Sequence, residues 1–358
     1  MESGDGQACT DRTVDQGTSV LNFSDSGTAK GNHLVVMVHG ILGSTNDWKF
    51  AADQFVRVFS DKVIVHCSES NEYSLTLDGV DVMGERLADE VIKVINQKPG
   101  LQKISFIVHS VGGLVARYAI GRLYRPAKIK TSENLEGGQC DGRIIGTIYG
   151  LEAMNFITFA TPHLGSRGNK QVPFLFGFPA LEKLAAIVIH LIFRRTGRHL
   201  FLTDCDEGTL PLLLRMLGDF NDLFFISALR AFKRRVAYSN ACYDNIVGWR
   251  TSSIRRNSEL PELGNSISEK YPHIVREFFS KEMPIEENDQ ISMINCDPDQ
   301  IEEEIVRGLS QVSWERIDVS FQDSKQRSAA HSIIQVKDEV VHSEGADVIQ
   351  HMIDHFLT

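Results

Sequence analysis

Short apolar runs recur along the chain and alternate with longer segments of helical pattern, and this alternation most limits the possible fold. Six runs have the length of strands: HLVVMV (33–38), KVIVHC (62–67), KISFIVH (103–109), NFITFAT (155–161), RRVAYSNA (234–241) and WERIDVSF (314–321). The first is apolar on both faces, as expected of a parallel strand covered by helices on both sides. Residues 78–97 place apolar side chains at three- and four-residue spacing, which is typical of an amphipathic helix. The pattern predicts an α/β fold, with a mainly parallel central sheet and helices on both faces.

Length and charge narrow the class of protein. The chain has 358 residues, 42% of them hydrophobic, which is enough for one large α/β domain over residues 31–358. Its 37 basic and 47 acidic residues give a net charge of −10, and no basic stripe interleaved with aromatic residues is present. Both features argue against a nucleic-acid partner.

The first thirty residues and the cysteines indicate the cellular compartment. Residues 1–30 are rich in Gly, Ser, Thr and acids and contain no apolar signal core, so we expect a disordered segment and no secretory signal. The six cysteines show no C-x-x-C spacing, which favours free thiols in a reducing compartment over a disulfide framework or a metal site. We therefore expect a cytoplasmic protein.

Ser110 lies between a predicted strand and a predicted helix, in FIVHSVGGLVARY (106–118). In a nucleophile elbow the serine occupies a tight strand-to-helix turn, and small neighbours are needed because strand and helix crowd together there. The usual G-x-S-x-G becomes VHSVG here, with Val108 in place of the first glycine. The alternative is that Ser110 only caps a helix.

A serine nucleophile needs a base and a carboxylate, and the order Ser, acid, His is expected of an α/β-hydrolase. Asp244 directly follows the strand 234–241, although an Asp-Asn pair is also common in turns. His331 lies between the last strand and the last helix and is the preferred base. His342 lies on the same side of that helix and is the second candidate. The sequence thus predicts the triad Ser110, Asp244 and His331.

The oxyanion of an acyl-transfer intermediate needs backbone N–H donors from two places. One follows the nucleophile, which indicates Val111, and the other lies in the loop after an early strand. The sequence HGILGS (39–44) occupies that loop, so Ile41 is the second donor and Leu42 its alternative. A plain glycine-containing turn would explain the same residues.

Several motifs together resemble the lipase-like serine esterases of plants and fungi, a family of the α/β-hydrolase fold. They are VVMVHGILGSTNDW, TLDGVDVMGERLADEV, VHSVGGLVARYAIGRLY, FATPHLGS, GRHLFLTD and YDNIVGWRTSSIRR. The resemblance covers roughly residues 33–356. It implies a Ser-His-Asp hydrolase of acyl esters, chiefly of lipids, that uses no metal or organic cofactor, and it supports Ser110, Asp244 and His331 in their roles. Val108 departs from the family, which has a small residue there, and a larger side chain could shift the turn and lower activity.

Two regions stand apart from the strand–helix pattern. Residues 164–232 are unusually apolar, especially 172–193 and 209–217, and we expect a helical cap or lid there, with packing as ordinary core as the alternative. Arg194, Arg195 and Arg198 follow and could meet anionic headgroups at a membrane or lipid surface, or form a solvated helix end. Residues 251–296 are polar, and we expect an irregular insertion.

Two other functions fit the same residues. A soluble carboxylesterase or thioesterase acting on a small ester would use the same triad, with the apolar region as core. A non-catalytic hydrolase-fold protein that binds a hydrophobic ligand would follow if Val108 relaxes the turn, because a fold alone does not establish activity.

Overall fold

A seven-stranded sheet organises the computed structural model, which describes residues 31–127, 146–166, 193–205, 209–266, 268–282 and 298–358. Its strand order is β10-β11-β9-β6-β3-β1-β2. The strands are β1 (His33–Val38), β2 (Val63–Cys67), β3 (Lys103–His109), β6 (Glu152–Phe159), β9 (Arg234–Asn240), β10 (Ile274–Ser280) and β11 (Trp314–Val319). All neighbouring pairs are parallel except β10 with β11. The predicted α/β-hydrolase fold class, with its mainly parallel sheet, is confirmed.

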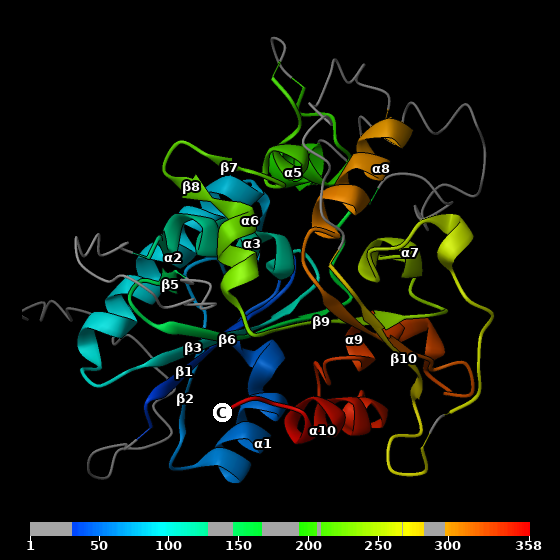
Figure 1. Ribbon diagram of the computed structural model, residues 1–358. Coiled ribbons are helices and arrows are strands. Elements are labelled where there is room, and N and C mark those ends of the chain that lie inside the picture. Colours follow the sequence, from blue (N-terminus) through cyan, green and yellow to red (C-terminus); the bar gives the residue numbers. More distant parts are fainter. Residues whose placement is uncertain (1–30, 128–145, 167–192, 206–208, 267, 283–297) are drawn as a thin grey trace, which may run out of the picture.

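Helices cover both faces of the sheet (Figure 1). One face carries α2 (Val80–Gln97), α3 (Gly112–Leu123), α5 (Leu212–Arg215), α6 (Phe225–Ala231) and α8 (Pro298–Leu309). The other carries α1 (Lys49–Phe59), α9 (Ala330–Ile333) and α10 (Ala346–Asp354). A short helix, α7 (Trp249–Ser252), follows β9, and two small hairpins pair β4 (Tyr124–Arg125) with β5 (Thr147–Ile148) and β7 (Asp219–Phe220) with β8 (Leu223–Phe224).

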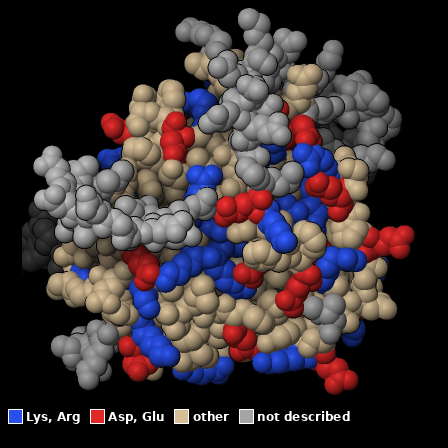
Figure 2. Space-filling view, in the orientation of Figure 1, with Lys and Arg blue, Asp and Glu red and all other residues tan. Residues whose placement is uncertain are grey.

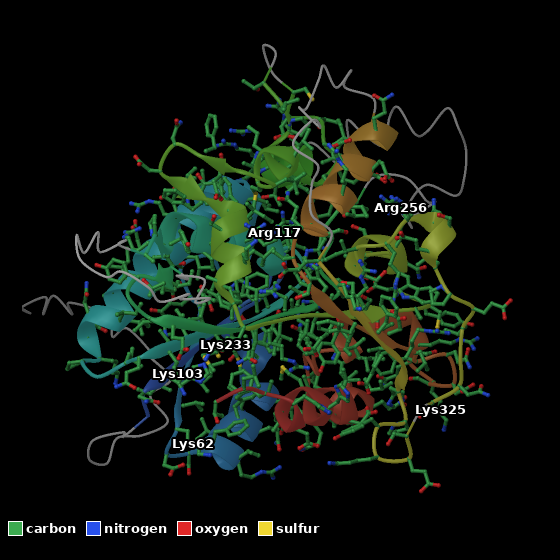
Figure 3. All side chains as sticks on the ribbon, in the orientation of Figure 1. Lys62, Lys103, Arg117, Lys233, Arg256 and Lys325 are labelled. Atoms are coloured by element: carbon green, nitrogen blue, oxygen red, sulfur yellow. The ribbon has the colours of Figure 1, made fainter. Side chains whose placement is uncertain are left out.

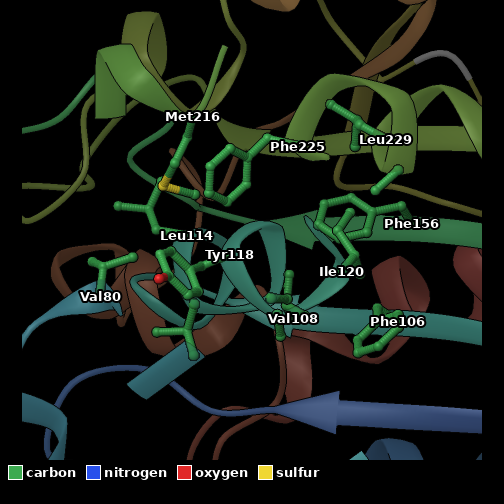
Figure 4. Packing of buried hydrophobic residues seen from close by; sticks show 14 of the residues in the cluster. Val80, Phe106, Val108, Leu114, Tyr118, Ile120, Phe156, Met216, Phe225 and Leu229 are labelled. Atoms are coloured by element: carbon green, nitrogen blue, oxygen red, sulfur yellow. The ribbon is translucent and has the colours of Figure 1, made fainter. Parts of the chain in front are cut away.

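Alternate side chains of each central strand enter opposite cores. In β1, Leu34, Val36 and Val38 pack with α2 and α3, whereas Val35 and Met37 pack with α1 and α10. The strand is therefore apolar on both faces, which explains its continuous hydrophobic run. Figure 4 shows the first of these cores, where Val108 lies among side chains of α3.

The parallel strands give the sheet two chemically different ends. Lys62, Lys103 and Lys233 precede or begin strands, so they mark the amino ends; Lys325 follows β11 and lies toward the carboxyl ends (Figure 3). Ligand sites of open α/β sheets lie outside the carboxyl ends of the strands. The candidate site is therefore expected on the side of Lys325.

The region 164–232 is only partly described. Residues 167–192, which contain nearly all of the segment 172–193, lie outside the described residues, as do residues 1–30. Residues 212–217 are described, and their apolar side chains are buried in the core shared with α2 and α3. The lid expected over residues 164–232 stays a prediction.

The expected irregular insertion at 251–296 contains regular structure. Its residues 274–280 form β10, an antiparallel strand at the edge of the sheet. Phe278 and Phe279 of this strand are exposed, so the strand lacks the buried run by which the parallel strands were identified. The expectation of an irregular segment was wrong for these residues, and residues 283–296 lie outside the described part.

Charges of both signs lie on the visible face of the molecule (Figure 2). Lys and Arg lie among Asp and Glu on the face shown in Figure 2. Ion pairs such as Arg256 with Glu259 and Glu303 neutralise part of this charge locally. In the described part of the chain, no helix is both long and apolar enough to span a membrane.

Candidate active site

Ser110 lies in a sharp turn between β3 and α3. Its φ of 54° is in the left-handed region, which costs a residue with a side chain roughly 1–2 kcal/mol. The turn is held by the N–H of Ser110, which donates to Phe159 O (2.9 Å), and by the N–H of Gly113, which donates to Ser110 O (3.0 Å). Strain of this kind persists only where the surrounding structure enforces it, and it is common at functional sites.

Glycines make room for the turn. A Cβ on Gly112 would lie 2.4 Å from His39 O, and a Cβ on Gly113 would lie 2.2 Å from Thr161 Oγ1. Gly40 has a similar role on the facing loop, because its Cβ would lie 2.8 Å from the Cβ of Ser110. The loop after β1, the end of β6 and the start of α3 can therefore meet at the serine.

His331 lies between Ser110 and Asp244 and contacts both. Its Nε2 is 3.1 Å from Ser110 Oγ, and its Nδ1 is 2.9 Å from Asp244 Oδ2. A carboxylate can only accept, so Nδ1 carries the proton, and Nε2 of the neutral ring accepts from the serine hydroxyl. This is the arrangement in which a histidine can act as a general base toward a serine.

Asp244 is buried and fully hydrogen-bonded. Its Oδ1 accepts from the N–H groups of Ile246 (3.0 Å) and Val247 (2.8 Å), and its Oδ2 also accepts from Asn240 Nδ2 (2.9 Å). Burial alone would raise the pKa of this carboxyl group. The positive charge of protonated His331 and these hydrogen bonds outweigh burial and lower the pKa below its ordinary value. The group is therefore an anion at neutral pH.

The structure distinguishes the two candidate bases. His331 is in the short helix α9, within hydrogen-bond reach of both partners. His342 instead accepts a hydrogen bond at Nδ1 from the N–H of Asp338, four residues before it. It is His331 that the structure brings to Ser110 and Asp244.

The two candidate oxyanion donors in the loop after β1 also differ. The N–H of Leu42 donates to Thr76 Oγ1 (2.8 Å), so this N–H already has an acceptor within the protein. Within the described residues, the N–H groups of Ile41 and Val111 donate to no protein acceptor. The geometry therefore favours Ile41 over Leu42 as the partner of Val111.

The structure also brings residues to the site that the sequence analysis did not single out. They are His109, whose Nε2 reaches the carbonyl of His331, Thr76, which fixes the loop after β1, and Asn240, which binds Asp244. His109 is adjacent to the nucleophile and Asn240 is near the end of the predicted strand 234–241, so position alone could have suggested these two. Thr76 carries no such signal.

Comparison with known proteins shows the family to which the chain belongs. A family model described as Putative serine esterase (DUF676) matches residues 28–254, more than half of the chain. The chain belongs to this serine esterase family. The family implied by the sequence motifs is thereby confirmed.

Two curated relatives of this chain come from yeasts. Putative lipase ROG1 of Saccharomyces cerevisiae is 30% identical over 231 residues, which are 63% of this chain and 29% of the relative. Putative lipase C4A8.10 of Schizosaccharomyces pombe is 26% identical over 240 residues, 64% of this chain and 27% of the relative. The chain thus spans less than a third of the length of these relatives.

Solved structures similar to this chain are more distant. Phospholipase PlaB from Legionella pneumophila is 17% identical, with a TM-score of 0.33, over 66% of this chain and 43% of that one. An esterase from Exiguobacterium antarcticum is 13% identical, with a TM-score of 0.32, over 63% of this chain and 79% of that one. The fold of this chain rests on its own sheet topology.

Proposed function

We propose that this serine esterase cleaves carboxylic acyl esters through Ser110, His331 and Asp244, with an acyl-enzyme intermediate. The observation that carries the proposal is the continuous path of hydrogen bonds from Ser110 Oγ through His331 to Asp244. Membership of the serine esterase family supports the same reaction class. The proposed chemistry requires no metal or organic cofactor.

The proposed first step forms the acyl-enzyme. Ser110 Oγ attacks the ester carbonyl carbon while its proton passes to His331 Nε2, and Asp244 stabilises the imidazolium that results. The N–H groups of Ile41 and Val111 receive the oxyanion. The ester C–O bond then breaks, and His331 returns the proton to the departing alkoxide, which leaves as an alcohol.

The second step releases the acid. A water molecule gives a proton to His331 and attacks the acyl carbon, and the bond to Ser110 Oγ breaks as the serine recovers its proton. Loss of one oxyanion donor in a comparable site costs roughly 2.7–4 kcal/mol of transition-state stabilisation. The conformation of the loop at Ile41 therefore affects the rate even though the side chain of Ile41 does not react.

Exposed apolar side chains near the site favour a lipid substrate. Leu42 lies in the loop after β1 and is 54% exposed; Tyr243 and Ile246 flank Asp244 and are also exposed. Tyr73 is exposed as well, and its N–H donates to Gly43 O, which places it beside the same loop. Exposed apolar side chains on the loops that carry the site are consistent with a surface that contacts lipids or partners. We propose that they receive a long acyl chain at a lipid surface.

Covalent labelling tests the nucleophile. Wild-type protein and Ser110→Ala are treated with a fluorophosphonate probe, followed by intact mass and peptide mapping. We expect one adduct on Ser110 in the wild type and none in the variant. Absence of labelling in folded wild-type protein, with and without detergent, would refute catalysis by Ser110 and favour the non-catalytic binding protein.

A chain-length series then tests the substrate class. Turnover of p-nitrophenyl esters from acetate to palmitate is compared with and without mixed micelles. A kcat/KM that rises with chain length supports a lipid ester. A maximum at acetate or butyrate would instead favour the soluble carboxylesterase.

A further inference from the structure

His109 is buried beside the nucleophile and is bonded to the segment that carries the base. It is the last residue of β3 and is 4% exposed. Its Nε2 lies 2.8 Å from the backbone oxygen of His331, a residue 222 positions away in the sequence. The two imidazole rings also contact each other, with centroids 4.6 Å apart. One side chain thus contacts both the backbone and the ring of the base.

The chemistry of the contact defines the state of His109. A carbonyl oxygen can only accept, so Nε2 of His109 carries a proton. Burial, followed by the nearby positive charge of His331, lowers the pKa of His109 well below its ordinary value. The ring is therefore neutral and adds no positive charge next to the imidazolium that forms during the reaction.

The carbonyl of His331 depends on this donor. His331 is in α9, a single turn from Ala330 to Ile333, in which the last carbonyl groups have no partner within the helix. In the described part of the chain no backbone N–H donates to His331 O, and His109 is the side chain that does. A partly buried carbonyl that loses its donor must find another or move toward water.

We propose that His109 is a positioning residue that, by donating Nε2–H to His331 O, fixes α9 and holds His331 Nε2 within reach of Ser110. The inference rests on the proposed function of Ser110, His331 and Asp244. Two independent links then set the ring of the base: Asp244 orients it from Nδ1, and His109 anchors its backbone. The Lys337–Asp47 ion pair (3.1 Å) ties the segment after α9 to the region after β1.

The test separates the hydrogen bond from the bulk of the ring. His109→Gln keeps an N–H donor near the position of Nε2, whereas His109→Leu fills similar space without a donor. Turnover of p-nitrophenyl butyrate is measured with thermal unfolding of each variant. Because a displacement of about 1 Å at a reacting group can cost about 100-fold in rate, we expect kcat of His109→Leu to fall about 10- to 100-fold. We expect KM to stay within about twofold and His109→Gln to recover most of kcat.

His33 provides the matched control. It is also a buried histidine, its Nε2 is hydrogen-bonded to Ser105 Oγ (2.8 Å), and it stacks on Phe356. It begins β1, at the opposite end of the sheet from the site. We expect His33→Leu to lower the unfolding temperature and leave kcat unchanged. An equal loss of kcat in His33→Leu and His109→Leu would show a general structural effect and overturn the proposal.

A double variant tests whether His109 acts through His331. In His331→Ala, adding His109→Leu should change the residual rate by less than about twofold, because the base to be positioned is gone. The same 10- to 100-fold loss in both backgrounds would contradict a positioning role.

The remaining outcomes are also decisive. Wild-type kcat in folded His109→Leu, or equal losses in the Leu and Gln variants, would overturn the inference while leaving the proposed function intact. If His109→Leu does not fold, His109→Met replaces it, because the flexible Met side chain adapts to irregular core space. Failure of the wild type itself to be labelled at Ser110 would refute the proposed function, and this inference with it.

Discussion

Replacing Asp244 by asparagine changes the charge and the proton pattern of the site while keeping the shape of the side chain. The carboxylate accepts four hydrogen bonds, from the N–H groups of Ile246 and Val247, from Asn240 Nδ2 and from His331 Nδ1. An asparagine oxygen can continue to accept from the two backbone groups. Its NH₂ group then faces two donors, Asn240 Nδ2 and His331 Nδ1–H.

The conflict is relieved most simply by a change of tautomer in the base. If the proton of His331 moves from Nδ1 to Nε2, Nδ1 can accept from the new amide, but Nε2 no longer has a lone pair for the hydroxyl of Ser110. The base is then in the wrong form to take the proton. The same substitution in a serine protease triad lowers kcat about 10⁴-fold, which at about 1.36 kcal/mol per factor of ten is about 5.4 kcal/mol.

The assay compares kcat for p-nitrophenyl butyrate in wild type, Asp244→Asn and Asp318→Asn. Asp318 is a matched control, because it is also buried and accepts from Trp249 Nε1 (2.7 Å) and Arg255 Nη1 (2.6 Å). We expect both variants to fold with a lowered unfolding temperature and only Asp244→Asn to lose turnover. More than about a tenth of wild-type kcat in Asp244→Asn would refute the tautomer argument and require an acid elsewhere.

Three further predictions concern the surroundings of the triad. Thr76→Val removes the acceptor of the Leu42 N–H, so kcat should fall several-fold with little change in KM; an unchanged kcat would show that this bond does not shape the oxyanion loop. Gly113→Ala places a Cβ 2.2 Å from Thr161 Oγ1, so we expect calorimetry to show a lower unfolding temperature, and the wild-type temperature would contradict the close packing of α3. The lowered pKa of Asp244 adds stability above the unfolded-state pKa of about 3.9, and this contribution is lost as pH falls through the folded-state pKa. The difference in unfolding temperature between wild type and Asp244→Asn should therefore narrow below about pH 4, and a constant difference would contradict this linkage.

The sequence predicts the parallel strands because they are buried on both faces. The predicted runs at 33–38 and 103–109 have the bounds of β1 and β3. Strand β10 was missed for the opposite reason, because an edge strand with exposed Phe278 and Phe279 has no continuous buried run. Hydrophobic periodicity and composition indicate which residues are buried. They do not identify a strand that is held mainly by backbone pairing to one neighbour.

The site shows a second limit of sequence reasoning. Ser110 and His331 are 221 positions apart, and their contact depends on where each loop leaves the sheet. Topology narrows the base to residues after the last strand, but the sequence offers no reason why His342 bonds locally to Asp338 instead. The anchor at His109 is even less visible, because its partner is a backbone carbonyl and leaves no pattern of residue types.

Valine at position 108 fits this turn because the small residues that the crowded turn requires lie at the start of the helix and not at the end of the strand. Val108 is fully buried in the same cluster as Leu114 and Ile120 of α3 (Figure 4). The close approach of helix and sheet takes place instead at Gly112 and Gly113, where a Cβ would meet His39 O and Thr161 Oγ1. A small residue at position 108 would leave space in this core, and the bulk of valine contributes buried apolar area. The turn at Ser110 still reaches a φ of 54°, and its hydroxyl lies 3.1 Å from Nε2 of His331, so the valine has not displaced the nucleophile from its base.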